Sequence, residues 1–330
     1  MKKLILHVGM PKTGTSAIQY FLEMNQSVLG GNGFAYPGNG TANSNRSTTG
    51  NAGELNRLAR QESEDPQEVF FKRFKKLVES EECVSADNVI LSNEGLHRLA
   101  SGFHSRIKEY CDAKNIDVQI VFYLRVQSEL LESGFLQRSK SGRVKFDDYF
   151  QVWSGKMNYL GFLDKLSEVY GRAALSVRRY GENLYRSSIV YDFCQLVNLE
   201  TSNLDCSQAS ARINLTPSLS ELSIVLYIAE LRGSVDKKFW NFIQQCSMNC
   251  GNRELDDSDK FRFSDKFVLK LKSLFDKDNK VVSEKYLNGE PFEIVARGGG
   301  NMGIPELSAM EKTFVRMLFG LYSHRRGKNA

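Results

Sequence analysis

The sequence predicts an α/β fold with a P-loop-like core, in which a central parallel sheet is flanked by helices and followed by a mainly helical C-terminal extension. Through the first 200 residues, short apolar runs alternate with stretches of helical periodicity, which is the pattern of parallel strands joined by helices. A glycine-containing turn separates the first apolar run from the first helical stretch, and beyond about residue 200 the strand pattern fades. We therefore expect a core over residues 1–200 and a mainly helical part over 201–330, packed on the same domain.

Four short apolar runs predict the strands of the sheet. The first, at residues 4–8, leads directly into the glycine-containing turn, and the second covers residues 89–91. The third, at residues 117–124, reads Asp-Val-Gln-Ile-Val-Phe-Tyr-Leu and is the clearest core strand of the chain, while the fourth covers residues 173–178. Alternation with helices predicts that these strands are parallel and covered on both faces.

Helical spacing of apolar residues follows the first strand at residues 15–29, and Ser92-Asn93-Glu94 after the second strand is a helix-start signal. Between them, residues 30–53 are rich in Gly, Asn, Ser and Thr, and a loop of this length is usually a functional loop or lid. Further helices are predicted at residues 68–78, 126–139, 189–199, 219–231, 239–246, 267–275 and 310–322.

Composition and charge exclude several classes of protein. Hydrophobic residues make up 41% and charged residues 25% of the chain, which is ordinary for a folded globular protein. The net charge of +5 is too small to indicate nucleic acid, but it suits an anionic small molecule or polymer. The six cysteines contain no CxxC pair, His7 interrupts the N-terminal apolar run, and no window is long enough to span a bilayer. We expect a reduced, cytoplasmic protein without an integral membrane segment.

Residues 9–16, which read Gly-Met-Pro-Lys-Thr-Gly-Thr-Ser, lie between the first predicted strand and the first predicted helix. Two glycines allow a tight turn whose amides converge, and the helix N-terminus adds unsatisfied N–H groups and a positive dipole end. Lys12 supplies a mobile positive charge, and Thr13, Thr15 and Ser16 supply hydroxyl groups. The motif therefore predicts a binding site for a phosphate or sulfonate group.

The position of the lysine separates this loop from that of nucleoside triphosphatases. Their loop places a lysine directly after the second glycine, followed by a hydroxyl that holds Mg²⁺. Here Thr15 follows Gly14, and the cation is Lys12. An ordinary ATP or GTP hydrolase is disfavoured, and no metal ligand set is evident. A nucleotide kinase or other phosphotransferase that uses ATP and Mg²⁺, and a binding protein without catalysis, remain alternatives.

The loop from Pro11 to Ser16, preceded by His7-Val8-Gly9 and followed by Gln19, resembles the 5′-phosphosulfate loop of sulfotransferases. The similarity is greatest to a bacterial branch that resembles glycan (heparan-type) sulfotransferases. Members of this family use 3′-phosphoadenosine-5′-phosphosulfate (PAPS) as donor. The resemblance implies a second motif, an arginine that ends a central strand and a serine eight residues later, and Arg125 and Ser133 have this spacing. By this resemblance the pair would bind the 3′-phosphate.

The resemblance also implies where the catalytic base and a closing loop lie. In the family the base follows the strand after the long acceptor loop, which points first to Glu94 and second to His97. On a helix these two residues would share a face; the alternatives are a carboxylate that complements a helix dipole and a packing histidine. His7 is predicted to support the loop through a side-chain hydrogen bond. Arg297, in a Gly-rich stretch, would be the counterpart of a C-terminal donor-binding loop or part of a flexible connector.

Together these features imply a PAPS-dependent sulfotransferase. It would move the sulfuryl group to a hydroxyl or amine of a saccharide-like acceptor and release 3′,5′-ADP, with Lys12 stabilising the leaving group and without a metal ion. The saccharide is implied by the resemblance to the glycan branch, and the sequence itself does not identify the acceptor.

Overall fold

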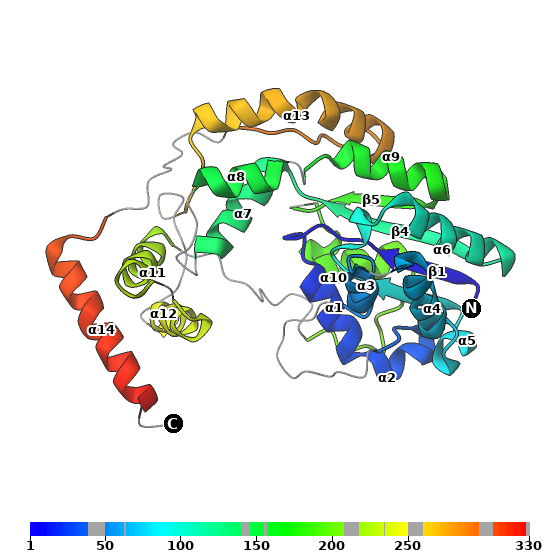
Figure 1. Ribbon diagram of the computed structural model, residues 1–330, viewed down its shortest axis with the longest axis horizontal. Coiled ribbons are helices and arrows are strands. Elements are labelled where there is room, and N and C mark those ends of the chain that lie inside the picture. Colours follow the sequence, from blue (N-terminus) through cyan, green and yellow to red (C-terminus); the bar gives the residue numbers. More distant parts are fainter. Residues whose placement is uncertain are drawn as a thin grey trace. The chain divides into compact units, whose positions relative to one another are not determined.

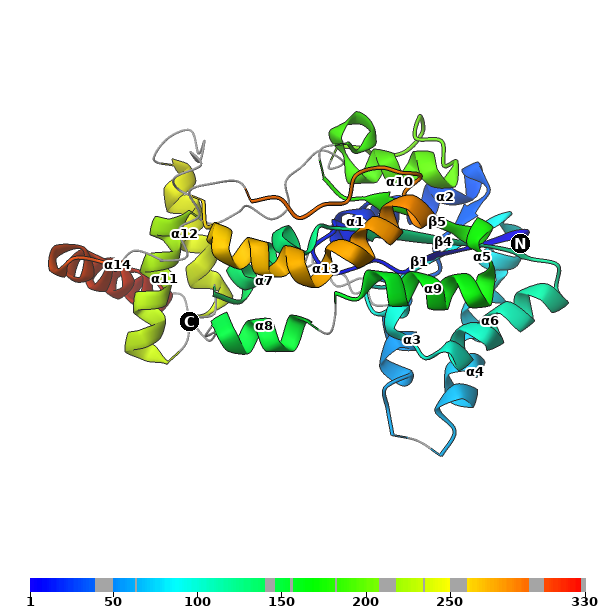
Figure 2. The same cartoon turned by 90° about the horizontal axis from the view of Figure 1, so that it is seen from above.

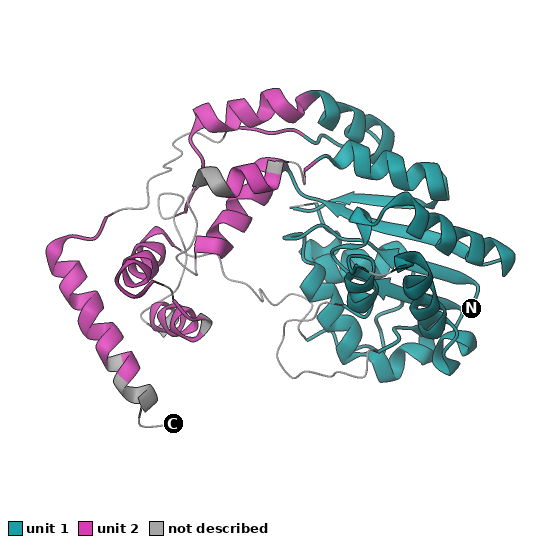
Figure 3. Ribbon diagram, in the orientation of Figure 1, with its two compact units in different colours: residues 1–126, 158–213, 277–292 teal, residues 127–157, 214–276, 293–330 magenta. Residues whose placement is uncertain are grey.

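The computed structural model describes residues 1–38, 50–62, 64–139, 146–154, 157–181, 183–207, 218–233, 235–249, 260–296 and 306–327. The chain divides into two compact units, and each of them draws on three separate stretches of sequence (Figure 3). The first comprises residues 1–126, 158–213 and 277–292, and the second comprises residues 127–157, 214–276 and 293–330. The packing of residues 201–330 on the same domain as residues 1–200 stays a prediction.

The first unit contains a five-stranded parallel sheet in the order β2-β3-β1-β4-β5, which confirms the predicted α/β fold (Figure 1). In β1 the register places Leu4 beside Val89 of β3 and Val118 of β4. All four predicted strands are present. The strands are β1 (Lys3–His7), β2 (Phe34–Ala35), β3 (Asn88–Ser92), β4 (Asp117–Leu124) and β5 (Leu175–Arg179).

The edge strand β2 is a feature that the sequence analysis assigned to a loop. It follows a 3₁₀ turn at Gly30–Asn32 and a left-handed Gly33 (φ 75°), and it pairs with Asn88 and Val89. A strand of two residues is too short to show an alternating pattern, so the composition of its surroundings dominated the prediction. Residues 39–49, the middle of the predicted lid, lie outside the described residues.

Helices cover both faces of the sheet (Figure 2). Ile5, Ile90 and Val121 form one apolar core with α1 (Thr15–Met24) and α10 (Ile189–Val197). The predicted helix over residues 15–29 breaks at Asn25, whose amide donates to Phe21 O (2.9 Å) and pairs with the backbone of Asp205, and α2 (Gln26–Leu29) follows the break. The other helices of this unit are α3 (Gly53–Leu58), α4 (Pro66–Val78), α5 (Glu81–Ser85), α6 (Ser101–Ala113) and α9 (Tyr159–Tyr170).

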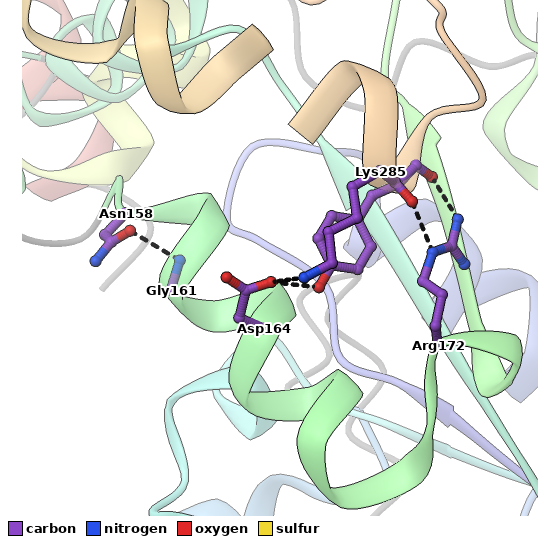
Figure 4. Close-up of polar contacts among 6 residues, drawn as sticks. Asn158, Gly161, Asp164, Arg172 and Lys285 are labelled. Carbon is purple, nitrogen blue, oxygen red and sulfur yellow. Dashed lines mark hydrogen bonds and ion pairs between the residues drawn. The ribbon is translucent and has the colours of Figure 1, made fainter. Parts of the chain in front are cut away.

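The chain returns to the first unit through residues 277–292, which include the C-terminal part of α13 (Asp265–Tyr286). Asp164 on α9 accepts hydrogen bonds from Lys285 Nζ and Tyr286 OH, both at 2.6 Å. Arg172 donates to the carbonyls of Lys285 (2.7 Å) and Tyr286 (3.3 Å), and Asn158 caps α9 by accepting from the Gly161 amide (Figure 4). These contacts attach residues 285 and 286, at the C-terminal end of α13, to the rest of the first unit.

The second unit is helical in its described part, as expected. An apolar cluster joins α11, α12 and α14 through Ile228, Phe239, Ile243 and Val315, and Ser218 with Glu221 forms a capping box at the start of α11. The helices of the second unit are α7 (Gln127–Ser139), α8 (Phe146–Ser154), α11 (Leu219–Arg232), α12 (Lys237–Asn249), the N-terminal part of α13, and α14 (Ala309–Gly327).

Within the described chain, every helix of either unit is too short or too polar to cross a bilayer.

Three buried histidines predict a sharp loss of stability in acid. Burial lowers the pKa of His7 and of His97 to about 3 and that of His104 to about 4, whereas an unfolded histidine titrates near 6.5. Between about pH 6.5 and pH 4 the unfolded chain therefore binds three protons that the folded chain does not. Linkage then lowers the free energy of unfolding by about 4 kcal/mol for each pH unit of acidification. Urea titrations between pH 7.5 and 5 measure this slope. A free energy of unfolding that does not change with pH would contradict neutral, buried imidazoles.

Candidate active site

The loop between β1 and α1 is held in a fixed shape by its own hydroxyl groups. Thr13 Oγ1 donates to Met10 O (2.6 Å), and Thr15 Oγ1 donates to the same carbonyl (3.3 Å). Gly14 precedes α1 in a left-handed conformation (φ 77°), and in the described chain no side chain caps this helix. The two threonines therefore shape the loop in this state, and the first amides of α1 are left for an anion.

Lys12 also adopts a left-handed backbone conformation (φ 67°), which is unfavourable for a residue with a Cβ. Strained backbone at such a position is a common feature of binding sites. Its carbonyl is fixed by Arg125, whose Nη1 donates to Lys12 O at 3.1 Å. Lys12 is therefore held in this turn by the residue that follows β4.

A substitution at Gly14 tests the shape of the loop. A Cβ at this position would lie 3.0 Å from Ile189 Cγ1 and 3.2 Å from Tyr180 Cε2, on a backbone with φ +77°. We expect Gly14→Ala to lower the free energy of unfolding by about 1–2 kcal/mol from the conformational strain alone and to weaken binding of anions at the loop. Urea denaturation and calorimetric titration measure both effects. Gly31→Ala, where a Cβ meets nothing within 4 Å, is the matched control and should bind normally.

The segment after β3 differs from its prediction. Residues 92–97 do not form an α-helix: the Asn93 side chain accepts from the Gly95 amide (2.7 Å), a 3₁₀ turn covers Leu96–Arg98, and α6 begins only at Ser101. A short polar side chain that bonds to a nearby amide competes with helix formation. Glu94 and His97 consequently do not share a helix face.

The two histidines of this region are buried, and His7 is hydrogen-bonded to a side chain whereas His97 is hydrogen-bonded to a backbone carbonyl. His7 Nδ1 lies 2.9 Å from Ser92 Oγ at the end of β3, and its predicted support of the loop stays a prediction. His97 Nδ1 lies 3.2 Å from Val8 O, and its ring stacks on Phe122. His97 is 1% exposed, and the roles predicted for Glu94 and His97 stay predictions.

Glu94 is half-buried and lies within the electrostatic reach of Lys12. Burial raises the pKa of Glu94, and the charges of Lys12 and Arg98 partly oppose this effect. Burial and the positive charge of Arg125 lower the pKa of Lys12, while Glu94 counteracts this change. A carboxylate and an amine that shift one another's pKa are typical of a functional site.

Arg125 occupies the carboxyl edge of the sheet, where α/β proteins bind ligands. Its guanidinium lies 5.4 Å from the centroid of the Tyr180 ring, and its carbonyl accepts from Tyr159 OH (2.7 Å). A hydrogen bond therefore joins Arg125 to the turn of Lys12, and the charge of Glu94 raises the pKa of Lys12 against the effects of burial and Arg125. The contact between Arg125 and Tyr180 was not predicted from the sequence.

Three further residues, Ser16, Ser133 and Arg297, were predicted from the sequence to belong to the site. Ser16 lies in the first turn of α1 and is half-buried. Ser133 lies on α7 in the second unit, and its pairing with Arg125 stays a prediction. Arg297 lies outside the described residues. Among the residues that are described, no group of three or more His, Cys, Asp or Glu side chains is arranged to hold a metal ion.

Among comparisons with known proteins, the one with solved structures finds a weak similarity. No protein family matches the chain, and no curated protein matches it. The chain is similar to the crystal structure of a sulfotransferase from Alicyclobacillus acidocaldarius, at 14% sequence identity and a TM-score of 0.39. The match covers 73% of this chain and 99% of that one. With identity and TM-score this low, the activity has to be inferred from the residues of the site.

Proposed function

We propose that this protein is a sulfotransferase that moves the sulfuryl group of PAPS to a hydroxyl or amine group of a saccharide-like acceptor. The observation that carries the proposal is the contact between Arg125 and the turn of Lys12, at 3.1 Å. PAPS has a phosphosulfate at its 5′ end and a phosphate at its 3′ position, so it needs two cationic sites close together. The loop motif and the Arg125–Ser133 spacing, both typical of sulfotransferases, add to this support.

The proposed reaction uses the Glu94 carboxylate, the Lys12 ammonium and the first amides of α1. The acceptor oxygen attacks sulfur in line while its proton moves to the Glu94 carboxylate. The bond between sulfur and the bridging oxygen of the 5′-phosphate breaks, and its electron pair stays on that oxygen. The Lys12 ammonium and the first amides of α1 stabilise the negative charge that develops there. The products are the sulfated acceptor, 3′,5′-ADP and a proton, which Glu94 passes to solvent.

Arg125 has two functions in this proposal. Its guanidinium group binds the 3′-phosphate, for which a planar fork of donors is well suited. The same side chain donates to the Lys12 carbonyl and so links the 3′-phosphate site to the loop. Stacking on Tyr180 limits the orientations that the guanidinium can adopt.

The shifted pKa values predict a narrow pH optimum. Burial raises the pKa of Glu94, so the acid limb of kcat/KM should lie above the usual glutamate range, because the base must be ionised. Burial lowers the pKa of Lys12, so the basic limb should lie below the usual lysine range, because the ammonium must be protonated. The pH dependence of kcat/KM reports the free enzyme, and a profile flat between pH 5 and 10 would exclude these two groups.

Ligand-induced stabilisation separates the proposal from a kinase. A ligand at 100 times its Kd stabilises the folded state by about 2.7 kcal/mol, which raises the melting temperature by several degrees for a chain of this size. We expect this shift with 3′,5′-ADP in the absence of Mg²⁺. A larger shift with ADP and Mg²⁺ would instead favour a phosphotransferase, and labelled sulfate transfer would exclude a binding protein without catalysis.

A further inference from the structure

A lysine on α9 holds the turn that follows Glu94. Lys165 Nζ donates to His97 O (2.9 Å) and to Leu99 O (2.8 Å), so it bridges the 3₁₀ turn and the residue that ends it. The last carbonyls of a helical turn lack backbone partners, and a lysine ammonium is well suited to bind them. Within the described chain, no carboxylate lies within 4.0 Å of this ammonium, so the turn is its principal polar partner.

His104, on α6, links the same turn to the C-terminal end of α9. Its Nε2 lies 3.1 Å from Leu96 O, and its Nδ1 lies 3.1 Å from Tyr170 OH. A carbonyl can only accept, so the single proton of the neutral ring is on Nε2. The Tyr170 hydroxyl is then the donor, shared between Nδ1 and His104 O (3.3 Å). Together with Lys165, this pair fixes three carbonyls between residues 96 and 99 from α9 and α6.

Glu94 lies between two fixed points of the backbone. On its N-terminal side, the Asn93 amide donates to His7 O (3.2 Å), at the end of β1. On its C-terminal side, the chain enters the turn that Lys165 holds. Glu94 itself belongs to neither a helix nor a strand, so regular secondary structure does not fix it. The position of its carboxylate therefore depends on these two anchors.

The same turn is connected to the loop between β1 and α1. His97 Nδ1 lies 3.2 Å from Val8 O, and because a carbonyl only accepts, Nδ1 is the donor. Burial lowers the pKa of His97, and hydrogen bonds to the backbones of Val8 and Glu94 oppose this effect. Val8 directly precedes Gly9, where the loop begins. A displacement of His97 would therefore reach both the segment of Glu94 and the start of the loop.

We propose that Lys165 is a positioning residue for the base of the transfer reaction, which holds the turn after β3 from α9 so that the Glu94 carboxylate stays aligned with the acceptor. This role rests on the proposed function, in which Glu94 accepts the proton of the acceptor. Lys165 acts only through His97 O and Leu99 O and touches neither substrate. A base has to lie within hydrogen-bond reach of the proton that it abstracts, and a misplacement of about 1 Å can lower the rate about 10²-fold.

The test begins with Lys165→Met, which removes both donors and keeps an unbranched side chain. With labelled PAPS and a glucosamine hexamer, which offers hydroxyl and amine groups, we expect kcat to fall about 10²-fold. The KM for PAPS and the Kd of 3′,5′-ADP should not change, because other residues bind the donor. Lys165→Arg keeps the charge and several donors and should recover most of the loss. Lys285→Met is the control, since Lys285 also contacts α9, through Asp164 at 2.6 Å (Figure 4), without contacting the turn.

A double variant separates positioning of the base from a general loss of structure. In a Glu94→Gln background, Lys165→Met should lower kcat no further, because the group that it positions can no longer accept a proton. Two independent effects would multiply instead. Hydrogen exchange gives a second measurement that does not depend on turnover. The amides of residues 94–99 should exchange at least about tenfold faster in Lys165→Met, as expected for the loss of hydrogen bonds from a charged donor, and at the rate of the wild type in Lys285→Met.

Three results would overturn the role of Lys165: wild-type turnover in Lys165→Met, losses that multiply in the double variant, or unchanged exchange of residues 94–99. If Lys165→Met does not fold, Lys165→Gln, which keeps a neutral donor, replaces it in the same experiments with the same expectations. Failure of the proposed function gives a different result, since the wild type would then neither bind 3′,5′-ADP nor transfer sulfate. If the wild type does both and Lys165→Met matches it, only the positioning role is wrong.

Discussion

Replacement of Glu94 by glutamine is expected to lower kcat by about 10²–10⁴-fold, the usual contribution of a general base, and to leave the affinity for 3′,5′-ADP unchanged. The side chain keeps its size and its half-buried position, so the loss would come from the missing proton acceptor. Burial raises the pKa of Glu94, which means that the ionised carboxylate is disfavoured in the folded state. A neutral amide should therefore not lower the melting temperature, and the loss of turnover could not be ascribed to unfolding.

The control for Glu94→Gln is a second variant that loses a carboxylate outside the candidate site. Glu109→Gln removes an exposed carboxylate from α6 and should keep the turnover of the wild type. Single-turnover sulfate transfer with both variants separates chemistry from product release. If Glu94→Gln has the turnover of the wild type, Glu94 is not the base; the fold and the donor site would be unaffected, and the buried His97 would have to be considered again.

Replacement of Lys12 by methionine is expected to reduce kcat by about 10²–10³-fold, which is typical for loss of one group that stabilises a developing negative charge. The ammonium is half-buried, where charge stabilisation is stronger than in water. Burial and Arg125 already lower the pKa of Lys12, so the free protein would not be destabilised by its removal. The loss should appear in kcat more than in the Kd of 3′,5′-ADP, because charge on the leaving oxygen is greatest in the transition state.

The left-handed backbone of Lys12 (φ 67°) offers a second variant. Lys12→Gly removes the cation and relieves a conformation that costs a residue with a Cβ about 1–2 kcal/mol. We expect this variant to be more stable than the wild type in urea and inactive in transfer. Lys72→Met, at an exposed position on α4, is the charge-matched control. Full activity in Lys12→Met would show that the loop amides alone carry the charge of the leaving group.

The parts of the fold that the sequence predicted are those whose signal is local. The strand at residues 117–124 is an apolar run with a buried end, and the loop at residues 9–16 combines a motif with its strand and helix context. Residues 34–35 form a strand only because β3 supplies a partner. The predicted helix start at Ser92-Asn93-Glu94 failed because the Asn93 side chain bonds to the Gly95 amide instead of a helix forming.

Part of the candidate site could likewise be predicted from local signals in the sequence. The loop motif selected Lys12, the resemblance to sulfotransferases pointed to Glu94 and Arg125, and parallel topology brings strand ends to one edge of the sheet. The hydrogen bonds from Thr13 and Thr15 to Met10 could not be foreseen, since they depend on the closure of the loop. Asn56 belongs to no motif, and its packing on α3 against Gly95, next to Glu94, depends on the tertiary fold.

The central claim is that Lys12 and Arg125 bind the two ends of one doubly phosphorylated adenosine. Calorimetric affinities of 3′,5′-ADP and 5′-AMP for the wild type and for Arg125→Gln test it directly, with Arg178→Gln, an exposed arginine on β5, as control. We predict that the wild type and Arg178→Gln bind 3′,5′-ADP at least about tenfold more tightly than 5′-AMP, and that Arg125→Gln binds the two nucleotides equally. A preference for 3′,5′-ADP that survives in Arg125→Gln would contradict the claim.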